Sequence, residues 1–338
     1  MNNAKFGTLT YARDIPTYLD WCRAAESFGF DFLGYGDSPT LWMDPYVILA
    51  LAAQVTQRVR LGITVTNPVT RHPAVAASAL ATLQHLSDGR VFCGVGGGDS
   101  AIYNSQLKPA PLSKIEAYVR TLQGLTGGAE AAYEGARIKF QWQPRRVPVW
   151  MSAEGPKTLD LAGRIADGVI IGCGITEDVV KDSIARIAAG ARAAGRDPDT
   201  IEKWWNVRIH FAHSEAEGWE QLRFIHASCA NKHFRFTLED KFVPEQYREP
   251  VRLLQRDYAF HEHADFTRPG HNAQLVEKYG LTEFLGRRFS ITGPAAQMVE
   301  RLRQIMSWGA SNLSVIQLYD DRVGYMRRLA NEIFPEVM

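Results

Sequence analysis

Short apolar segments alternate with segments of helical spacing along most of the chain, and this alternation restricts the possible folds more than any other feature. Eight apolar segments can be counted, and each is followed by residues whose apolar positions recur roughly every three to four places, as in a helix. Strands that alternate with helices run parallel and are joined by right-handed crossovers. The predicted strands are Lys5–Leu9, Phe32–Gly36, Arg60–Val65, Val91–Val95, Pro148–Ser152, Gly168–Gly172, Trp204–Ala212 and Asn312–Gln317.

Eight parallel strands are compatible with a closed barrel or with an open sheet covered on both faces. The pattern shows no break into two halves, which an open doubly wound sheet would have. The length of 338 residues also fits a barrel, because such barrels commonly contain about 200 to 400 residues. We therefore predict an α/β fold in which residues 1–338 form one (β/α)8 TIM barrel.

Two stretches interrupt the alternation. Residues 129–147 contain Gly135 and alternating apolar and polar residues, which predict a hairpin insertion before the fifth strand. Residues 229–287 lie between the seventh and eighth strands and are too many for a loop without secondary structure. We predict a helical insertion there, at the mouth of the barrel, as a lid or as part of an oligomer interface.

Charge and cysteine content narrow the classes of partner. The formal net charge of +1 gives no basis for binding nucleic acid or an anionic membrane. No apolar run approaches the roughly 18 residues that span a bilayer, and the first residues lack the apolar segment of a signal peptide. The four cysteines form no C-x-x-C pair, so we expect free thiols rather than a zinc site. A cytoplasmic protein that acts on a small molecule is therefore expected.

A glycine-rich segment follows the fourth predicted strand, where active sites of barrels lie. Gly96, Gly97 and Gly98 precede Asp99, and such a segment lets backbone N–H groups approach a bulky anion or an aromatic ring system. A tight turn without a ligand is the alternative. A dinucleotide fingerprint is rejected, because the third glycine is misplaced and Asp99 would crowd a pyrophosphate.

Gly155-Pro156, after the fifth predicted strand, begins a helix whose free N–H groups can bind phosphate. A helix start without a ligand is the alternative, but two such loops on one rim favour a phosphorylated cofactor. His261 and His263 are two residues apart, which on a helix turns their rings away from each other, so we expect no metal site. These histidines and Trp204 could shape a substrate pocket, with packing or surface roles as the alternative.

The chain resembles the luciferase-like oxidoreductases, and in particular the methylenetetrahydromethanopterin reductase branch, which uses a deazaflavin. One further segment, Ser307–Leu313, resembles the deazaflavin-dependent sugar-phosphate dehydrogenases. The resemblance covers nearly the whole chain except residues 229–280 and implies a bacterial luciferase-like barrel. The segments that carry the resemblance to the reductase branch are Arg60–Leu83, Gly94–Ala101, Lys108–Leu112 and Pro148–Pro156.

The resemblance also implies a cofactor site, for coenzyme F420 or alternatively for FMN. Asp37 would lie at the ring end, and Thr64-Val65 falls where the family has a non-prolyl cis peptide beneath the ring. Residues in the two loops would contact the rest of the cofactor. The residues expected to contact the chain of the cofactor are Gly97, Gly98 and Asp99, and those expected to hold its phosphate are Ala153, Gly155 and Pro156.

One departure from the dehydrogenase branch concerns acid–base chemistry. That branch has a histidine directly after the aspartate of the second strand, but this chain has Ser38, which does not titrate near neutrality. Trp42 keeps the matching aromatic position, and Arg288 falls near a residue that binds a substrate anion in that branch. The residues expected near the reacting face are Asp37, Ser38, Asn67 and Asp99, and those expected to contact substrate are Trp42 and Arg288.

Three functions follow from these patterns. The first is F420-dependent hydride transfer to or from a small organic substrate. The second is a two-component monooxygenase that uses reduced FMN and needs a flavin reductase as partner. The third is a non-catalytic flavin-binding protein, which the polar strand ends disfavour. The family resemblance further implies a homodimer.

Overall fold

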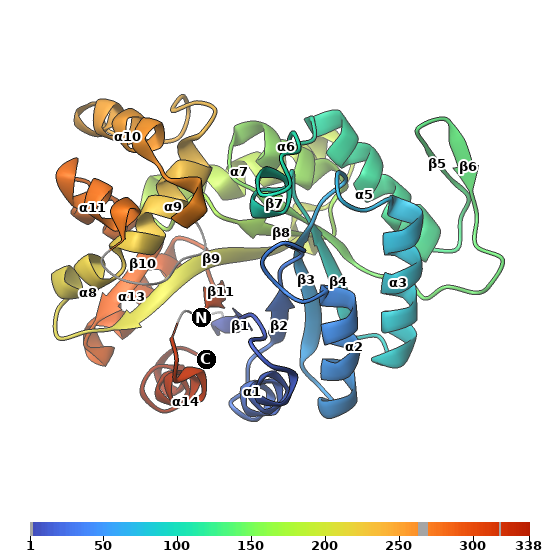
Figure 1. Cartoon of the computed structure of the whole chain (residues 1–338), viewed down its shortest axis with the longest axis horizontal. Helices are drawn as coiled ribbons and strands as arrows, with labels where there is room; N and C mark the ends of the chain where they lie inside the picture. Colours follow the sequence, from blue (N-terminus) through green and yellow to red (C-terminus); the bar gives the residue numbers. More distant parts are fainter. Residues whose placement is uncertain (1–2, 263–269, 318) are drawn as a thin grey trace.

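In the computed structural model, which describes residues 3–262, 270–317 and 319–338, a ring of parallel strands is surrounded by helices (Figure 1). The ring runs β1-β2-β3-β4-β7-β8-β9-β11, and it closes because β11 pairs with β1 while β8 pairs with β9. This confirms the predicted eight-stranded barrel. The strands are β1 (Lys5–Leu9), β2 (Phe32–Tyr35), β3 (Arg60–Thr66), β4 (Val91–Val95), β7 (Val149–Ala153), β8 (Gly168–Ile171), β9 (Glu202–Phe211) and β11 (Asn312–Ile316).

One further strand, β10 (Ser290–Gly293), was not among the predicted strands. It pairs in parallel with the second half of β9, from Arg208 to Phe211, where β9 extends beyond its other neighbours. Its sequence, Ser-Ile-Thr-Gly, has a single apolar residue, Ile291, so it did not stand out as an apolar segment in the way that the equally short β2 and β8 did.

Some helices begin where a side chain accepts hydrogen bonds from free backbone N–H groups. Asp14 Oδ1 accepts from Thr17 N at 2.8 Å, and Asp44 Oδ1 accepts from Tyr46 N at 2.9 Å. The helices are α1 (Ile15–Ser27), α2 (Pro45–Val55), α3 (Pro73–Leu86), α4 (Ser100–Tyr103), α5 (Leu112–Thr126), α6 (Pro156–Ile165), α7 (Glu177–Ala193), α8 (Glu215–Gln221), α9 (Arg223–Phe234), α10 (Glu245–Asp257), α11 (His271–Lys278), α12 (Thr282–Phe289), α13 (Ala295–Ser307), α14 (Arg322–Glu332) and α15 (Phe334–Val337), with short 3-10 helices at Pro198–Thr200 and Phe260–Glu262.

Large aromatic side chains fill the lower end of the barrel. We call Phe32, Phe92, Trp150 and Trp204 the aromatic floor; all four are fully buried. Glycines on neighbouring strands leave the space, since a Cβ atom on Gly62 would lie 2.0 Å from the Phe92 ring. Trp204 therefore lies beneath the site, so that of its two predicted roles packing is confirmed and a place in a substrate pocket is not. The floor leaves the carboxyl end of the barrel as the side on which a ligand can enter.

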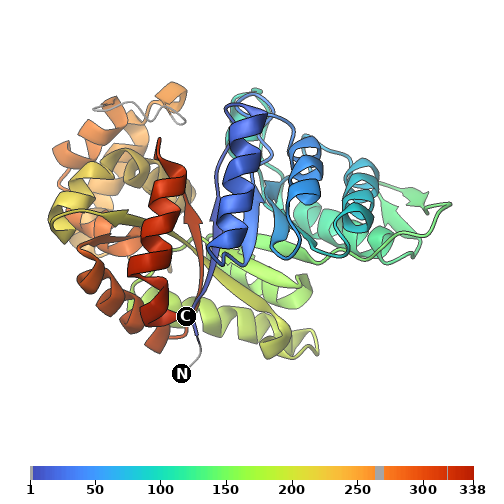
Figure 2. The ribbon, with the colours of Figure 1, turned by 90° about the horizontal axis from the view of Figure 1, so that it is seen from below.

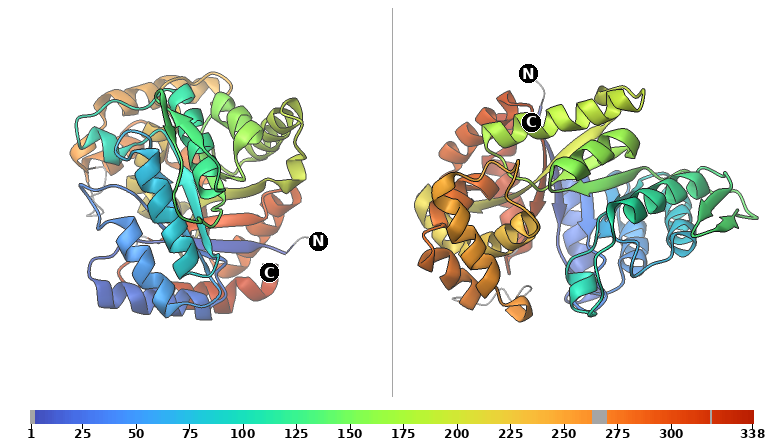
Figure 3. Two further views of the ribbon diagram at one scale, coloured as in Figure 1. Left: turned by 90° about the vertical axis from the view of Figure 1, so that its right-hand side faces the viewer. Right: turned by 90° about the horizontal axis from the view of Figure 1, so that it is seen from above.

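The segment between β9 and β11 contains helices α9 to α12, which pack around a second apolar core that includes Phe234, Leu254 and Phe289. These helices lie together on one side of the barrel, and the hairpin β5 (Ala131–Tyr133) with β6 (Ala136–Ile138) projects on the opposite side (Figure 3). His263 lies outside the described residues.

The two ends of the chain lie next to each other at the base of the barrel (Figure 2). Ala4 N donates to Val337 O at 2.8 Å. Within the described residues, no helix combines the length and the apolar character needed to cross a membrane.

Candidate functional site

Several inward-facing side chains lie at the carboxyl ends of the barrel strands, and some of them are partly exposed. Side chains alternate along a strand, so Trp204 in the floor places Asn206 and Arg208 on the inner face of β9. Asn206 and, on the facing strands, Thr64, Val65 and Ser152 point inward and yet remain partly exposed. A ligand can therefore reach the layer directly above the aromatic floor.

Val65 and two glycines shape the β3 and β4 side of the mouth. The peptide bond between Thr64 and Val65 is cis, which confirms the expectation from the family resemblance. A Cβ atom on Gly94 would lie 2.8 Å from Val65 Cγ1, and one on Gly96 would lie 3.0 Å from Val65 Cγ2. Glycine at both positions lets Val65 occupy the inside of the barrel, as a platform for a planar ligand.

Asp37, predicted to lie near the reacting face, is 2% exposed and held by two neighbours. Its Oδ2 accepts from Thr66 Oγ1 at 2.7 Å and from Arg71 Nε at 2.6 Å, and its Oδ1 accepts from Arg71 Nη2 at 3.0 Å. Arg71 also donates to Asp44 at 2.6 Å. Because both carboxylate oxygens are engaged, the structure favours a role for Asp37 in fixing the loops after β2 and β3.

Asn67 is also buried and occupied by local contacts. Its Oδ1 accepts from the backbone N–H groups of Val69 and Thr70, and its Nδ2 donates to Thr70 Oγ1 at 2.9 Å. This is an Asx-type turn, in which the side chain stands in for backbone. Asn67 therefore shapes the loop after β3.

The loops after β2 and β4 meet through two hydroxyl groups. Ser38 Oγ and Ser100 Oγ are 2.7 Å apart, and either can be the donor. The glycine segment lies beside this contact, and Gly98 has a φ of +87°, in the left-handed region that favours glycine. Ser38 is thus brought together with the predicted cofactor loop.

Asp99 of the glycine segment forms an ion pair with the helical segment above the barrel. Its Oδ1 lies 3.0 Å from Arg235 Nη1, and both side chains are 17% exposed. The Arg235 guanidinium also lies over the rings of Tyr103 and Phe260, at 4.6 and 5.4 Å from their centroids. The segment that follows α9 is therefore anchored on the glycine segment.

Trp42, a predicted substrate residue, stacks on Tyr11. The two rings are 3.8 Å apart and nearly parallel, at an interplanar angle of 8°. Both side chains are partly exposed and come from the loops after β2 and β1. They form a flat aromatic wall beside Ser38.

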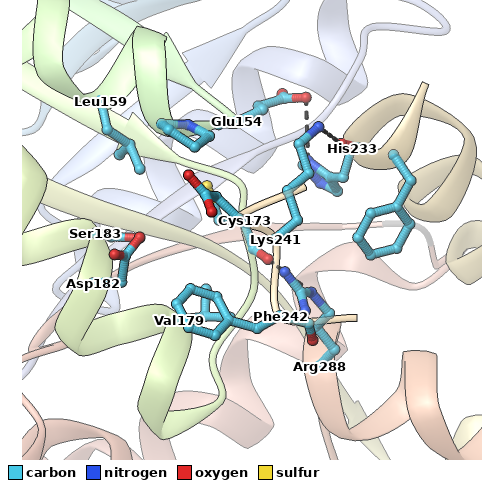
Figure 4. Close-up of a pocket in the computed structure, with 14 residues that line it drawn as sticks. Glu154, Leu159, Cys173, Val179, Asp182, Ser183, His233, Lys241, Phe242 and Arg288 are labelled. Carbon is cyan, nitrogen blue, oxygen red and sulfur yellow. Dashed lines mark hydrogen bonds and ion pairs between the residues drawn. The ribbon is translucent and has the colours of Figure 1, made fainter. Parts of the chain in front are cut away.

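A small pocket next to α6 brings together the predicted phosphate residues and Arg288 (Figure 4). Gly155, Pro156, Lys241, Phe242 and Arg288 line it. Arg288 is 3% exposed; its Nε donates to Cys173 O at 2.9 Å and its Nη1 to Phe242 O at 3.2 Å. Glu154, Asp182 and Asp240 also line the pocket, but within the described residues no carboxylate lies within 4.0 Å of Lys241 or Arg288, so these two cations are available to an anion.

The N–H groups at the start of α6 are partly occupied. Thr158 Oγ1 accepts from Glu154 N at 3.1 Å and from Gly155 N at 3.2 Å. Ala153 is fully buried, and its carbonyl accepts from Gly172 N at 3.1 Å. Gly155 thus contributes an open approach, since a Cβ atom there would be 3.5 Å from Lys241 Cε. The positive charge in this pocket comes from Lys241 and Arg288.

Glu154 on the inner face of the mouth is held by two residues of α9. Its carboxylate lies 2.6 Å from Lys232 Nζ and 3.2 Å from His233 Nδ1. Burial alone would raise the pKa of Glu154, but Lys232 and His233 hold that pKa well below its usual range. Burial lowers the pKa of His233, so the charge that balances Glu154 is that of Lys232.

Several functional side chains were missed by the sequence prediction, namely Tyr11, Glu154, Arg208, Lys232 and Lys241. Arg208 could have been found, because residues 204, 206 and 208 alternate on the inner face of a predicted strand. Lys232 and Lys241 lie in the segment after β9, and only its folding over the barrel brings them to the mouth.

Buried polar atoms without partners show that the mouth fits a polar ligand. Thr10 Oγ1, Thr64 Oγ1, Asn206 Oδ1 and Arg208 Nε have no hydrogen-bond partner among the described residues. Such atoms cost free energy unless a ligand or water satisfies them. Thr64, Asn206 and Arg208 are on the inner face of the barrel with Val65, so the residues present fit a planar cofactor that carries a phosphate.

Comparison with known proteins supports the fold independently of the strand pattern. A family model described as luciferase-like monooxygenase matches residues 2–312. A solved structure of coenzyme F420 dependent tetrahydromethanopterin reductase from Methanopyrus kandleri matches with a TM-score of 0.73. That match covers 100% of both chains at 22% sequence identity.

Two curated relatives are similar over part of their length. The 5,10-methylenetetrahydromethanopterin reductase of Methanolobus tindarius is 34% identical over 189 residues, which cover 54% of this chain and 57% of that protein. The F420-dependent hydroxymycolic acid dehydrogenase of Mycobacterium tuberculosis is 33% identical over 203 residues, which cover 54% of this chain and 55% of that protein. The chain thus spans less than two thirds of the length of each of these two relatives.

Proposed function

Because the chain belongs to the luciferase-like monooxygenase family, we propose that it is an oxidoreductase that uses coenzyme F420 to transfer a hydride to or from a small organic substrate. One observation carries the proposal. The open mouth is bordered by Val65 and by the glycine segment, and it contains buried polar atoms that lack partners. The similarity to an F420-dependent dehydrogenase makes a deazaflavin the first candidate for the group that fills this space.

F420, when bound, supplies a ring carbon that gives or takes a hydride, which is two electrons with one proton. The chain's own part is to bind and orient. Val65 would support the ring from below, while Gly97 and Gly98 would let the backbone approach the chain that carries the phosphate. Lys241 and Arg288, with the opening at Gly155, would hold the anionic end.

Proton exchange with the substrate falls to groups on the other side of the ring. Ser38 and Ser100 can pass a proton between them, because each hydroxyl is both a donor and an acceptor. Asp99 is the ionisable candidate of the glycine segment, and Arg235 holds its charge. Trp42 and Tyr11 would exclude water from this side as a stacked wall.

Reduced FMN is the second candidate, because the matching family model describes luciferase-like monooxygenases. A monooxygenase of this kind would need a flavin reductase as partner. The Arg288 pocket binds an anion in either case, so it does not separate the two cofactors.

The test is a fluorescence titration of the purified protein with F420, with oxidised FMN and, under anaerobic conditions, with reduced FMN. We expect F420 to bind at least tenfold more tightly than either form of FMN. Preferential binding of reduced FMN would overturn the F420 proposal in favour of the monooxygenase. Absence of binding by all three would overturn both.

A further inference from the structure

Arg208 lies on the wall of the mouth that faces Val65. In the closed ring, β9 is four strands away from β3 in either direction, so the two strands are diametrically opposite. Arg208 is on the inner face of β9, two layers above Trp204 of the aromatic floor. A molecule bound on the Val65 platform would therefore have Arg208 across from it.

The charge of Arg208 has no counter-charge nearby. The residue is 8% exposed, and its Nε has no hydrogen-bond partner. Within the described residues, no carboxylate lies within 4.0 Å of its guanidinium. A buried cation without a partner is costly, and such groups are retained where a ligand supplies the missing charge.

The neighbours of Arg208 add a second cation and one carboxylate. Lys232 is close enough for the two positive charges to oppose each other, and Glu154 pairs with Lys232 at 2.6 Å. His226 stays neutral, because burial, together with the nearby charges of Arg208 and His210, lowers its pKa to about 3. Asp99 also faces Lys232 but is balanced by Arg235, so Arg208 and Lys232 against Glu154 leave a single positive charge on this wall, which matches a monoanion.

We propose that Arg208, assisted by Lys232, binds a carboxylate group of the substrate on the wall of the mouth that faces the cofactor platform. This inference deepens the proposed function and rests on it. The site is separate from the Arg288 pocket, whose lining includes neither Arg208 nor Lys232. A carboxylate fits better than a phosphate monoester, which would carry more negative charge than this wall can balance.

A bound carboxylate would also supply the hydrogen-bond partner that Arg208 Nε lacks. A carboxylate has two oxygens that accept hydrogen bonds, and Arg208 presents N–H donors from a planar guanidinium. Held there, an acid would place the carbon next to its carboxylate over the platform. The substrate class is then a small organic acid whose reacting carbon lies near the carboxylate.

The test uses two probe pairs of equal shape, acetate with acetamide and benzoate with benzamide, titrated calorimetrically into protein with and without F420. We expect each acid to bind at least tenfold more tightly than its amide. In Arg208→Met this preference should disappear, while Arg208→Lys should keep part of it. Arg303→Met, which removes an arginine that pairs with Glu336 near the C-terminus at the base of the barrel, is the matched control and should bind as the unchanged protein does.

Equal binding of acid and amide in both pairs would overturn the inference, as would an Arg208→Met variant that keeps the preference. If Arg208→Met instead weakens F420 binding and leaves the acids unaffected, the arginine serves the cofactor and the inference fails. Because the acids are titrated also without F420, failure of F420 to bind contradicts only the proposed function. Thermal unfolding of Arg208→Met should match that of the unchanged protein, since an unpaired buried cation is exchanged for an apolar chain of similar length.

Discussion

Two adjacent glycines in the segment after β4 should respond differently to substitution by alanine. At Gly98 the change should lower the stability of the fold, and at Gly97 it should lower the affinity for F420. Gly98 has a φ of +87°, and a Cβ atom there would lie 2.8 Å from Ile102 Cγ2. Gly98→Ala places an L-residue in the left-handed region, which costs about 1–2 kcal/mol, and crowds Ile102 as well. We expect a loss of about 2 kcal/mol in the free energy of unfolding.

Gly97→Ala should leave stability almost unchanged. The backbone there is outside the left-handed region, and a Cβ atom would be 3.5 Å from Ile115 Cδ1, which is ordinary contact. If the cofactor chain passes over this residue, the added methyl group occupies part of its space. We expect F420 affinity to fall about tenfold, which corresponds to roughly 1.4 kcal/mol.

Urea unfolding without ligand and fluorescence titration with F420 separate the two effects. Gly98→Ala should unfold at a lower urea concentration than the unchanged protein. Gly97→Ala should unfold at the same urea concentration as the unchanged protein but bind F420 more weakly. Unchanged F420 affinity in Gly97→Ala would refute the argument that the glycine segment approaches the cofactor. A fully stable Gly98→Ala would show that the backbone at this position is not constrained as the structure describes.

Two further predictions concern buried carboxylates. Asp37→Asn removes the charge that Arg71 and Thr66 hold and should lower the free energy of unfolding by about 2–3 kcal/mol in urea, because Arg71 keeps Asp44 as a partner. As a control, Asp44→Asn changes the more exposed partner of Arg71 and should lower the free energy of unfolding by less than about 1 kcal/mol. An Asp37→Asn variant that keeps full stability but has little turnover would instead assign Asp37 to catalysis. Glu154→Gln should be less stable than the unchanged protein near pH 7, because Lys232 and His233 lower the pKa of Glu154 in the folded state. A lowered pKa stabilises the fold above the unfolded value of about 4.5, so this difference should shrink as the pH falls below that value, and a constant difference in urea unfolding between pH 7 and pH 3 would contradict the assignment.

The barrel could be predicted from the sequence because its signal is local. Each strand and each helix shows its own periodicity, and eight repeats of that signal leave few topologies. β10 escaped this reasoning, because its four residues pair with β9 only after α12 has brought them there. The role of Trp204 was left open for a related reason. The alternation along a strand shows which side chains point into the barrel, but not whether one of them lies in the aromatic floor or at the mouth.

The site was predictable where its residues follow the strands directly. The glycine segment and Gly155-Pro156 follow β4 and β7, and the structure places both at the mouth. What a side chain does there depends on partners far away in the sequence. Asp37 looks available in the sequence, but Arg71 and Thr66 occupy both of its oxygens. Lys232, 78 positions after Glu154, shows the converse, because only the fold brings the two charges together.

The distribution of charge around the mouth suggests how specificity arises in this chain. The Val65 platform and the glycines next to it carry no charge, while the opposite wall presents Arg208 of β9 and Lys232 of α9, with Glu154 paired to Lys232. Ser38 removes a titrating group from the place where the dehydrogenase branch has histidine. A substrate can then be oriented by its own charge, with one end held on the β9 wall and the reacting carbon over the platform. In such a site the rate should depend strongly on the substrate's carboxylate, because Arg208 and Lys232 would hold the substrate through charge-assisted hydrogen bonds to that group.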